Sequence, residues 1–108
     1  MIQISIYRDK TGRIRRFVAQ GHSGYAPHGE DIVCAAVSAL VQTAVLGLEG
    51  LTQIAPGVVV EDGNLDCQIS GCGGDNIKVD AILETMLLGL QAIEADYPAF
   101  VSICQMRI

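Results

Sequence analysis

Two residues that can form a thiol nucleophile and its base lie at the two ends of one short stretch of the chain. His22 follows a predicted strand, and Cys34 lies in the first turn of a predicted helix. A cysteine thiolate attacks carbonyl carbon, and an adjacent imidazole can take up the thiol proton and return it. The stretch therefore predicts nucleophilic catalysis if the loop between the two residues brings them together.

The start of that helix is a favourable place for a reactive thiol. Asp31 or Glu30 can accept hydrogen bonds from the unpaired backbone N–H groups, which places the cap about three residues before Cys34. The remaining N–H groups and the positive end of the helix favour a thiolate. The Asp31 carboxylate opposes that effect, so its useful roles are to cap the helix or to orient His22. Ser38 lies one helical turn beyond Cys34 on the same face, within reach of the site.

The loop before this helix contains several residues with special backbone geometry. Gly24, Pro27 and Gly29 punctuate it, and Tyr25 lies among them. We expect residues 23–30 to form a lid that becomes ordered when a peptide binds, excludes water and holds the histidine against the thiol.

Two alternatives remain open at this point. Free cysteine is among the most buried residue types, so Cys34 can equally be a small core residue in a helix rich in alanine and valine. His28, on the same loop, is a rival base for the thiol. The position of Cys34 at the helix start and the glycines before it favour the catalytic interpretation with His22.

The length and composition predict one domain, residues 1–108, with an aliphatic core. Half of the residues are hydrophobic, and tryptophan is absent. The net charge of −5 argues against non-specific binding to DNA or RNA, which needs a basic surface.

The longest apolar stretch, from Asp31 to about Glu49, is interrupted by polar residues and falls short of a membrane span. The N-terminus lacks the pattern of a signal peptide, so we expect a cytoplasmic protein that binds neither membrane nor nucleic acid.

The cysteines of the chain are scattered, at Cys34, Cys67, Cys72 and Cys104. The cytoplasm keeps such cysteines reduced. Cys67 and Cys72 have no second pair or histidine cluster to complete a zinc site, so we expect no bound metal. A thiol-redox function is disfavoured because no second cysteine lies near Cys34 in the sequence.

The order of elements predicts an α+β fold. Isoleucines alternate with polar residues at the N-terminus, and turn residues from Asp9 to Gly12 then connect a hairpin. A second hairpin follows later, and an apolar stretch with helical character comes after each hairpin. The expected elements are strands at residues 2–6, 14–19, 58–60, 65–69 and 100–108, and helices at 31–49 and 75–95. This order, ββαββαβ, indicates two layers, in which two helices lie on one face of a mainly antiparallel five-stranded sheet.

The two helices carry further expectations. Gly47 and Gly50 are expected to weaken the last turns of the first helix and to end it. The helices carry more apolar surface than one face of the sheet can cover, at Leu46 of the first helix and at Leu83 and Leu87 of the second. We therefore expect a homodimer.

The motif around the candidate residues resembles that of a known protease family. The ribosomal-processing cysteine proteases of bacteria, called Prp, have a similar pattern of Gly-His at 21–22, Gly-x-Asp-x-Val-Cys-Ala at 29–35 and Ser at 38. The resemblance extends over the whole chain in length and element order. It implies that His22 and Cys34 form a catalytic dyad and that Asp31 and Ser38 support the site.

The resemblance implies a cysteine endopeptidase that removes a short N-terminal extension from the large-subunit ribosomal protein L-twenty-seven. Cleavage in this family follows an aromatic residue at the end of a largely apolar recognition peptide. A homodimer, the absence of a cofactor and a flexible loop over the site, residues 24–30, are also implied. Ser23 stands where the family usually has a small residue, often alanine. The competing class is a non-enzymatic ribosome-associated module, in which Cys34 only packs and the loop binds a partner protein.

Overall fold

The alternation of isoleucine with polar residues in β1 (Ile2–Arg8) decides which face of the sheet is covered. Side chains of a strand point alternately to its two faces. Ile2, Ile4 and Ile6 therefore point the same way, and each is at most 4% exposed, whereas Gln3 is exposed. The isoleucines belong to a core that they share with residues of both helices.

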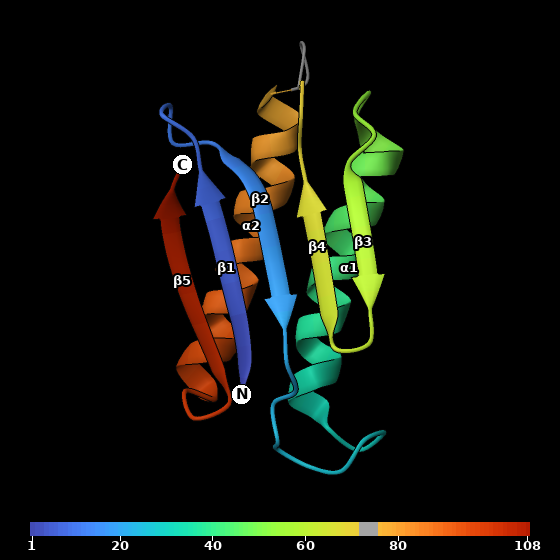
Figure 1. Ribbon diagram of the computed structural model, residues 1–108, viewed down its shortest axis with the longest axis vertical. Coiled ribbons are helices and arrows are strands. Elements are labelled where there is room, and N and C mark those ends of the chain that lie inside the picture. Colours follow the sequence, from blue (N-terminus) through green and yellow to red (C-terminus); the bar gives the residue numbers. More distant parts are fainter. Residues whose placement is uncertain (72–75) are drawn as a thin grey trace.

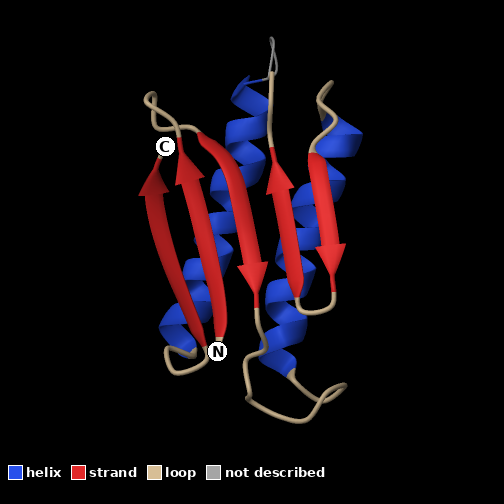
Figure 2. Cartoon of the chain, viewed as in Figure 1, coloured by secondary structure: helices blue, strands red, loops and turns tan. Residues whose placement is uncertain are grey.

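The computed structural model describes residues 1–71 and 76–108. After β1 the elements are β2 (Ile14–Gln20), α1 (Ile32–Leu51), β3 (Gly57–Glu61), β4 (Asn64–Gln68), α2 (Asn76–Asp96) and β5 (Val101–Arg107). The five strands form one sheet, and both helices lie on the same face of it (Figures 1 and 2). The predicted order and the predicted two-layer α+β arrangement are confirmed.

The strand order is β3-β4-β2-β1-β5. Neighbouring strands are antiparallel except β1 and β5, which pair in parallel because the chain crosses back along α2 before it enters β5. One end of the sheet consequently brings together the end of β2, the start of β1 and the turn between β3 and β4 (Figure 1). We call this the site edge of the sheet. The loop that leads from β2 to α1 is at this same edge, so the candidate residues gather there.

The first helix does not end at its glycines, which corrects the prediction for Gly47 and Gly50. α1 continues to Leu51, and the Thr52 hydroxyl donates a hydrogen bond to the Leu48 carbonyl at 2.6 Å. A glycine inside a helix costs only about 1 kcal/mol relative to alanine, which packing along the rest of the helix outweighs. Gly47 lies at the contact with α2, where a Cβ atom would be 3.5 Å from Ile82.

By length and composition, α1 is apolar enough to cross a membrane. The core helices of soluble proteins pass the same test, and one face of α1 packs in the core of this structure. One row of α1 residues is buried in the core shared with the sheet and α2, namely Val33, Val37, Val41, Ala44 and Leu48. The opposite face is open, and Leu46 is 67% exposed there.

The second helix packs more completely than the sequence suggested. The sequence predicts that Leu83 and Leu87 exceed what a two-layer chain can cover, but both side chains are buried in the core of the single chain. The reason is close contact between the helices: a Cβ atom on Gly89 would lie only 2.9 Å from a Leu40 methyl group of α1. Only Leu46 of the three residues remains as a reason to expect a partner. Residue 75, where we expect the second helix to begin, lies outside the described residues.

Gly21 provides a test of how the site edge of the sheet is built. It has a φ of +93°, and a Cβ atom there would lie 2.6 Å from the Met1 carbonyl oxygen. Gly24 also has a positive φ, +74°, but open space around it. Both alanine variants carry left-handed strain of about 1–2 kcal/mol, and Gly21→Ala must in addition displace backbone. We expect urea unfolding to show a clearly larger loss of stability for Gly21→Ala than for Gly24→Ala. Equal losses would show that the contact with Met1 is easily relieved.

Candidate active site

The position of His22 is determined by a glycine on each side of it in space. Gly21 directly follows β2, and its N–H donates a hydrogen bond to the Gly63 carbonyl at 2.8 Å. The His22 ring then lies against Gly63, where a Cβ atom would be 3.0 Å from Nε2. Gly63 has a φ of +71° in the turn between β3 and β4. This contact was missed by sequence reasoning, although the Asp62-Gly63 pair at a hairpin turn is the signal that points to a glycine-dependent conformation.

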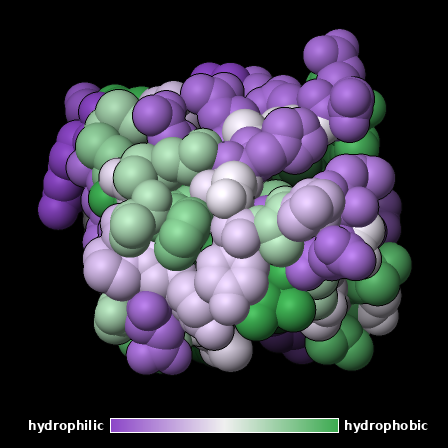
Figure 3. All heavy atoms as spheres, turned by 90° about the horizontal axis from the view of Figure 1, so that it is seen from below, coloured by the Kyte–Doolittle hydropathy of each residue, from purple (hydrophilic) through white to green (hydrophobic). Residues whose placement is uncertain are grey.

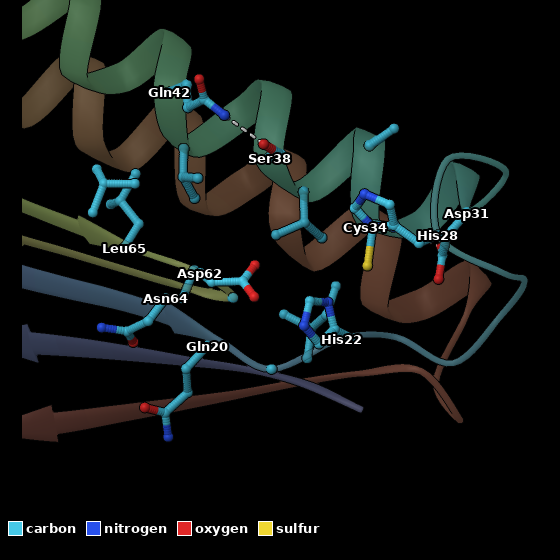
Figure 4. A pocket seen from close by; sticks show the side chains of 18 of the residues that line it. Gln20, His22, His28, Asp31, Cys34, Ser38, Gln42, Asp62, Asn64 and Leu65 are labelled. Atoms are coloured by element: carbon cyan, nitrogen blue, oxygen red, sulfur yellow. Dashed lines mark hydrogen bonds between the residues drawn. The ribbon is translucent and has the colours of Figure 1, made fainter.

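Cys34 is presented by the capped start of α1. Asp31 is the N-cap, and its Oδ1 accepts a hydrogen bond from the Cys34 N–H at 2.9 Å. The cysteine is half-buried, and its Sγ accepts a hydrogen bond from the Ser23 N–H at 3.3 Å. In Figure 4 the sulfur points from α1 into the cavity on the side where His22 lies. The loop therefore brings the predicted nucleophile and base to the same place.

A cavity of about 810 Å³ separates α1 from the site edge of the sheet. It is lined by residues of the strand ends, the β3–β4 turn, the loop and one face of α1, among them Ile2, Gln20, His22, Gly24, His28, Gly29, Asp31, Cys34, Val37, Ser38, Val41, Gln42, Val60, Asp62, Asn64 and Leu65. All four residues predicted to act in or support catalysis, His22, Asp31, Cys34 and Ser38, thus face one space (Figure 4).

Asp31 caps the helix and holds Ser23, rather than orienting the histidine. One carboxylate oxygen accepts the Cys34 N–H, and the other accepts a hydrogen bond from the Ser23 hydroxyl. Burial by itself raises the pKa of Asp31, but the hydrogen bonds from Ser23 and from the Cys34 N–H outweigh it and lower the pKa to about 2. The Asp31 carboxyl group is therefore ionised at neutral pH. Of the two roles that the sequence offers for it, capping the helix and orienting His22, the structure shows the capping role.

Ser23 is a site residue that the sequence analysis undervalued. It is 3% exposed, and its hydroxyl accepts a hydrogen bond from the Tyr25 N–H at 3.1 Å while donating to Asp31. Its position next to His22 was the available signal. A buried hydroxyl that donates to a helix cap is, however, decided only by tertiary contacts.

Ser38 lies on the cavity side of α1, as its spacing from Cys34 predicts. Its hydroxyl accepts a hydrogen bond from Gln42 Nε2 at 2.5 Å, one turn further along the helix (Figure 4). The pair forms a polar stretch of an otherwise aliphatic wall.

The loop residues divide into two groups. Gly24 and Gly29 line the cavity, whereas the Tyr25 ring packs edge-on against Tyr97 and Phe100 at centroid distances of 5.6 and 5.3 Å. Pro27 does not line the cavity either, and its carbonyl accepts the Glu30 N–H in a turn at 2.9 Å. Tyr25 therefore fastens the loop to the corner between α2 and β5. Seen from this end, the molecular surface is mixed, with hydrophobic atoms exposed between polar ones (Figure 3).

His28 remains a second histidine of the site because it also lines the cavity. Its side chain reaches inward from the loop, whereas His22 is held by the end of β2 (Figure 4). His22, which follows β2 and contacts Gly63, is therefore the better supported candidate for the base.

The remaining cysteines differ from Cys34 in their surroundings. Cys67 is fully buried on β4, and burial, followed by the charges of Asp66 and Glu49, raises the pKa of its thiol to about 12. Cys104 is exposed on β5. Cys72 lies outside the described residues. Within residues 1–71 and 76–108 no group of three or more histidine, cysteine or acidic side chains is placed to hold a metal ion.

Known proteins similar to this chain match most of its length. The family model of the cysteine protease Prp matches residues 1–102. The ribosomal processing cysteine protease Prp of Staphylococcus aureus (strain Mu50) is 33% identical over 97 residues, which cover 90% of this chain and 92% of that protein. The protein of the same name from Bacillus subtilis (strain 168) is 35% identical over 101 residues, with 90% of each chain covered.

The fold is also similar to crystal structures of an essential ribosomal processing protease Prp from S. aureus. One of them contains a covalently linked product peptide; its TM-score is 0.90 at 30% identity, over 97% of this chain and 99% of that chain. Another contains a substrate peptide and has a TM-score of 0.86 at 29% identity, with the same coverage.

The lowered pKa of Asp31 predicts how acid acts on the site. Because the folded pKa lies below its ordinary value of 3.8, the stabilising contribution of Asp31 is present above that value. It is lost as the pH falls toward about 2. Asp31→Asn keeps a capping oxygen that does not titrate. We expect the urea midpoint of the native protein to exceed that of Asp31→Asn at pH 6 and to lose this advantage between about pH 4 and 2. Since Asp9 and Glu84, whose pKa values are also lowered, occur in both proteins, their effects cancel. An advantage that is independent of pH would contradict the assignment.

Proposed function

The chain belongs to the cysteine protease Prp family and is a cysteine protease, and we propose that Cys34 is its nucleophile and His22 its general base. The observation that carries this proposal is the shared cavity. Cys34 faces it from the capped start of α1, and His22 faces it from the end of β2. The two elements are separate layers of the fold, so their side chains can approach a substrate from two sides.

The chemistry follows from these two groups. The Cys34 thiolate forms a bond to the scissile carbonyl carbon, and the carbonyl π electrons move to its oxygen. When this adduct collapses, the carbon–nitrogen bond breaks and His22 gives a proton to the leaving amine. Water, activated by the same imidazole, then cleaves the thioester and regenerates the thiol. The positive end of α1 supports the negative charge of the sulfur before it attacks and again when the thioester is cleaved.

We propose that the substrate is the N-terminal extension of the large-subunit ribosomal protein L-twenty-seven, cut after an aromatic residue. The names of the relatives, ribosomal processing proteases with bound substrate or product peptides, support a ribosomal-protein peptide. The cavity supports its apolar character because aliphatic side chains form much of the wall, including Ile2, Val37, Val41, Val60 and Leu65. Glu61 and Asp62 add an acidic margin that suits a basic protein partner. The alternative of a non-enzymatic module has no comparable support, since the relatives are proteases.

Cleavage of a synthetic peptide that spans this extension, read by mass spectrometry, tests the proposal. We expect Cys34→Ala to bind the peptide without cutting it, because the truncation removes the nucleophile and leaves the cavity. His22→Ala should lower kcat by about 10²–10⁴-fold through loss of the base, and His28→Ala is the matched comparison on the same cavity. If His28→Ala causes the larger loss, the base is His28. Cleavage by Cys34→Ala would overturn the assignment altogether.

Labelling with iodoacetamide gives a second readout on the same variants. Cys34 should react before Cys67, which is buried and has its thiol pKa raised to about 12. Site-resolved mass spectrometry across pH distinguishes the two. Faster labelling of Cys67 would contradict a nucleophilic Cys34.

We also propose that two copies of the chain associate through the open faces of the helices. The support is exposed aliphatic surface: Leu46 is 67% exposed on α1, and Leu88 is 67% exposed on α2. Light scattering at micromolar concentration should give twice the mass of the chain. Leu46→Glu should shift it toward the monomer because a charge at the interface must be desolvated, whereas Val59→Glu on β3, also an exposed aliphatic position, should not. A monomeric native protein would exclude this interface.

A further inference from the structure

The site contains one backbone donor that the two-residue mechanism leaves unused. The Ser23 N–H is 3.3 Å from Cys34 Sγ and donates a hydrogen bond to it. Ser23 directly follows the proposed base in the sequence, and its side chain is buried. A main-chain N–H that already bonds to the attacking sulfur lies on the side of the site where this sulfur meets the scissile carbonyl group.

The donor that a cysteine nucleophile at a helix start would ordinarily supply is occupied here. The Cys34 N–H donates to Asp31 Oδ1 at 2.9 Å, and the Ala35 N–H donates to the Asp31 carbonyl at 3.1 Å. With a pKa of about 2, the Asp31 carboxylate keeps its charge and its hold on the Cys34 N–H at neutral pH. An oxyanion that used the Cys34 N–H would have to displace an ionised carboxylate from it, at the cost of the helix cap.

We propose that the main-chain N–H of Ser23 is the oxyanion donor of this protease. In the free enzyme it bonds to Sγ. When Sγ forms its bond to the scissile carbon and the carbonyl π electrons move to oxygen, the N–H transfers its hydrogen bond from sulfur to that oxygen. This stabilises the charge where it develops, because the oxygen sits on the carbon bonded to the sulfur. The proposal rests on Cys34 as the nucleophile.

The surrounding contacts hold this donor in place before substrate arrives. The Ser23 hydroxyl donates to the carboxylate of Asp31 and accepts the Tyr25 N–H, so the side chain is restrained from two directions. Asp31 in turn is held by α1 through the Cys34 N–H. The donor and the sulfur therefore belong to one hydrogen-bonded unit. A donor that is fixed in advance costs no reorganisation when the charge appears, and this is the property that makes such groups effective.

The direct test replaces the N–H of Ser23 by an ester oxygen and keeps the side chain. Residues 1–33, as a synthetic thioester, can be ligated to residues 34–108, which begin with Cys34, and the full native sequence results. The matched control is the same ester at Thr11, whose N–H also donates a hydrogen bond, to Asp9 at 2.8 Å. Thr11 lies in the β1–β2 turn, at the opposite end of the sheet from the loop (Figure 1). We expect the Ser23 ester to lower kcat for the peptide by about 10²–10³-fold with little change in KM. The Thr11 ester should match the unmodified ligated protein.

A peptide aldehyde separates this role from an effect on the thiol alone. It forms a hemithioacetal whose oxygen imitates the oxyanion, so its affinity should fall in the Ser23 ester by a factor similar to that in kcat. If the ester instead slows iodoacetamide labelling and leaves aldehyde affinity unchanged, the N–H serves only the resting sulfur and the proposal is wrong. Unchanged kcat in the Ser23 ester, with Cys34→Ala inactive, would overturn the oxyanion assignment and leave the nucleophile intact.

The unmodified protein allows a second measurement that does not depend on how the ester variants fold. In ¹⁵N-labelled protein, formation of the hemithioacetal should move the Ser23 amide proton downfield, because it exchanges a sulfur acceptor for an oxygen, which is the stronger acceptor. The Cys34 amide proton should change little since it stays on Asp31. A downfield shift of the Cys34, Val33 or Ile32 amide in place of Ser23 would assign the oxyanion to the helix start and refute the proposal.

Discussion

The Asp31 carboxylate is the interaction on which the arrangement of the site depends. One of its oxygens caps α1 through the Cys34 N–H, and the other accepts the Ser23 hydroxyl from the strand side of the loop. A single ionised group thus joins the element that carries the sulfur to the segment that carries the histidine. Because both bonds favour the charged form, the lowered pKa of Asp31 and the geometry of the site have the same origin.

This bridge is effective only because each of its two sides is rigid. On the helix side, α1 is anchored by the buried row from Val33 to Leu48. On the strand side, Gly21 bonds to the β3–β4 turn, and the His22 ring rests on Gly63. The backbone at Gly21 and Gly63 has positive φ, which glycine adopts without the strain that other residues incur. The rest of the loop lies between these supports, and Tyr25 secures it to the corner formed by Tyr97 and Phe100.

The same helix serves the core and the site, and this limits how the site can vary. Cys34 follows the fully buried Val33 by one position, while Ser38 follows Val37 in the same way. A rotation of α1 that moved the sulfur would also expose core side chains, each worth about 1.5–3 kcal/mol when fully buried. The hydrophobic core therefore supplies the precision that a nucleophile needs.

The sequence alone determined the elements, their order and the main candidates of the site. Alternating isoleucines, turn residues and a cap placed before Cys34 are local signals, and local signals suffice for a strand, a hairpin and a helix start. Contacts between distant segments were decided only by the tertiary structure. Examples are the parallel pairing of β1 with β5, the burial of Leu83 and Leu87, and the continuation of α1 beyond Gly47 to Leu51. Ser23 shows the reason most clearly. Its neighbours in the sequence do not predict its contacts, but in the fold its N–H donates to Cys34 Sγ and its hydroxyl donates to the Asp31 carboxylate. The hydrogen-bond partners of a buried group come from whichever elements pack against it, and these can be distant in the sequence.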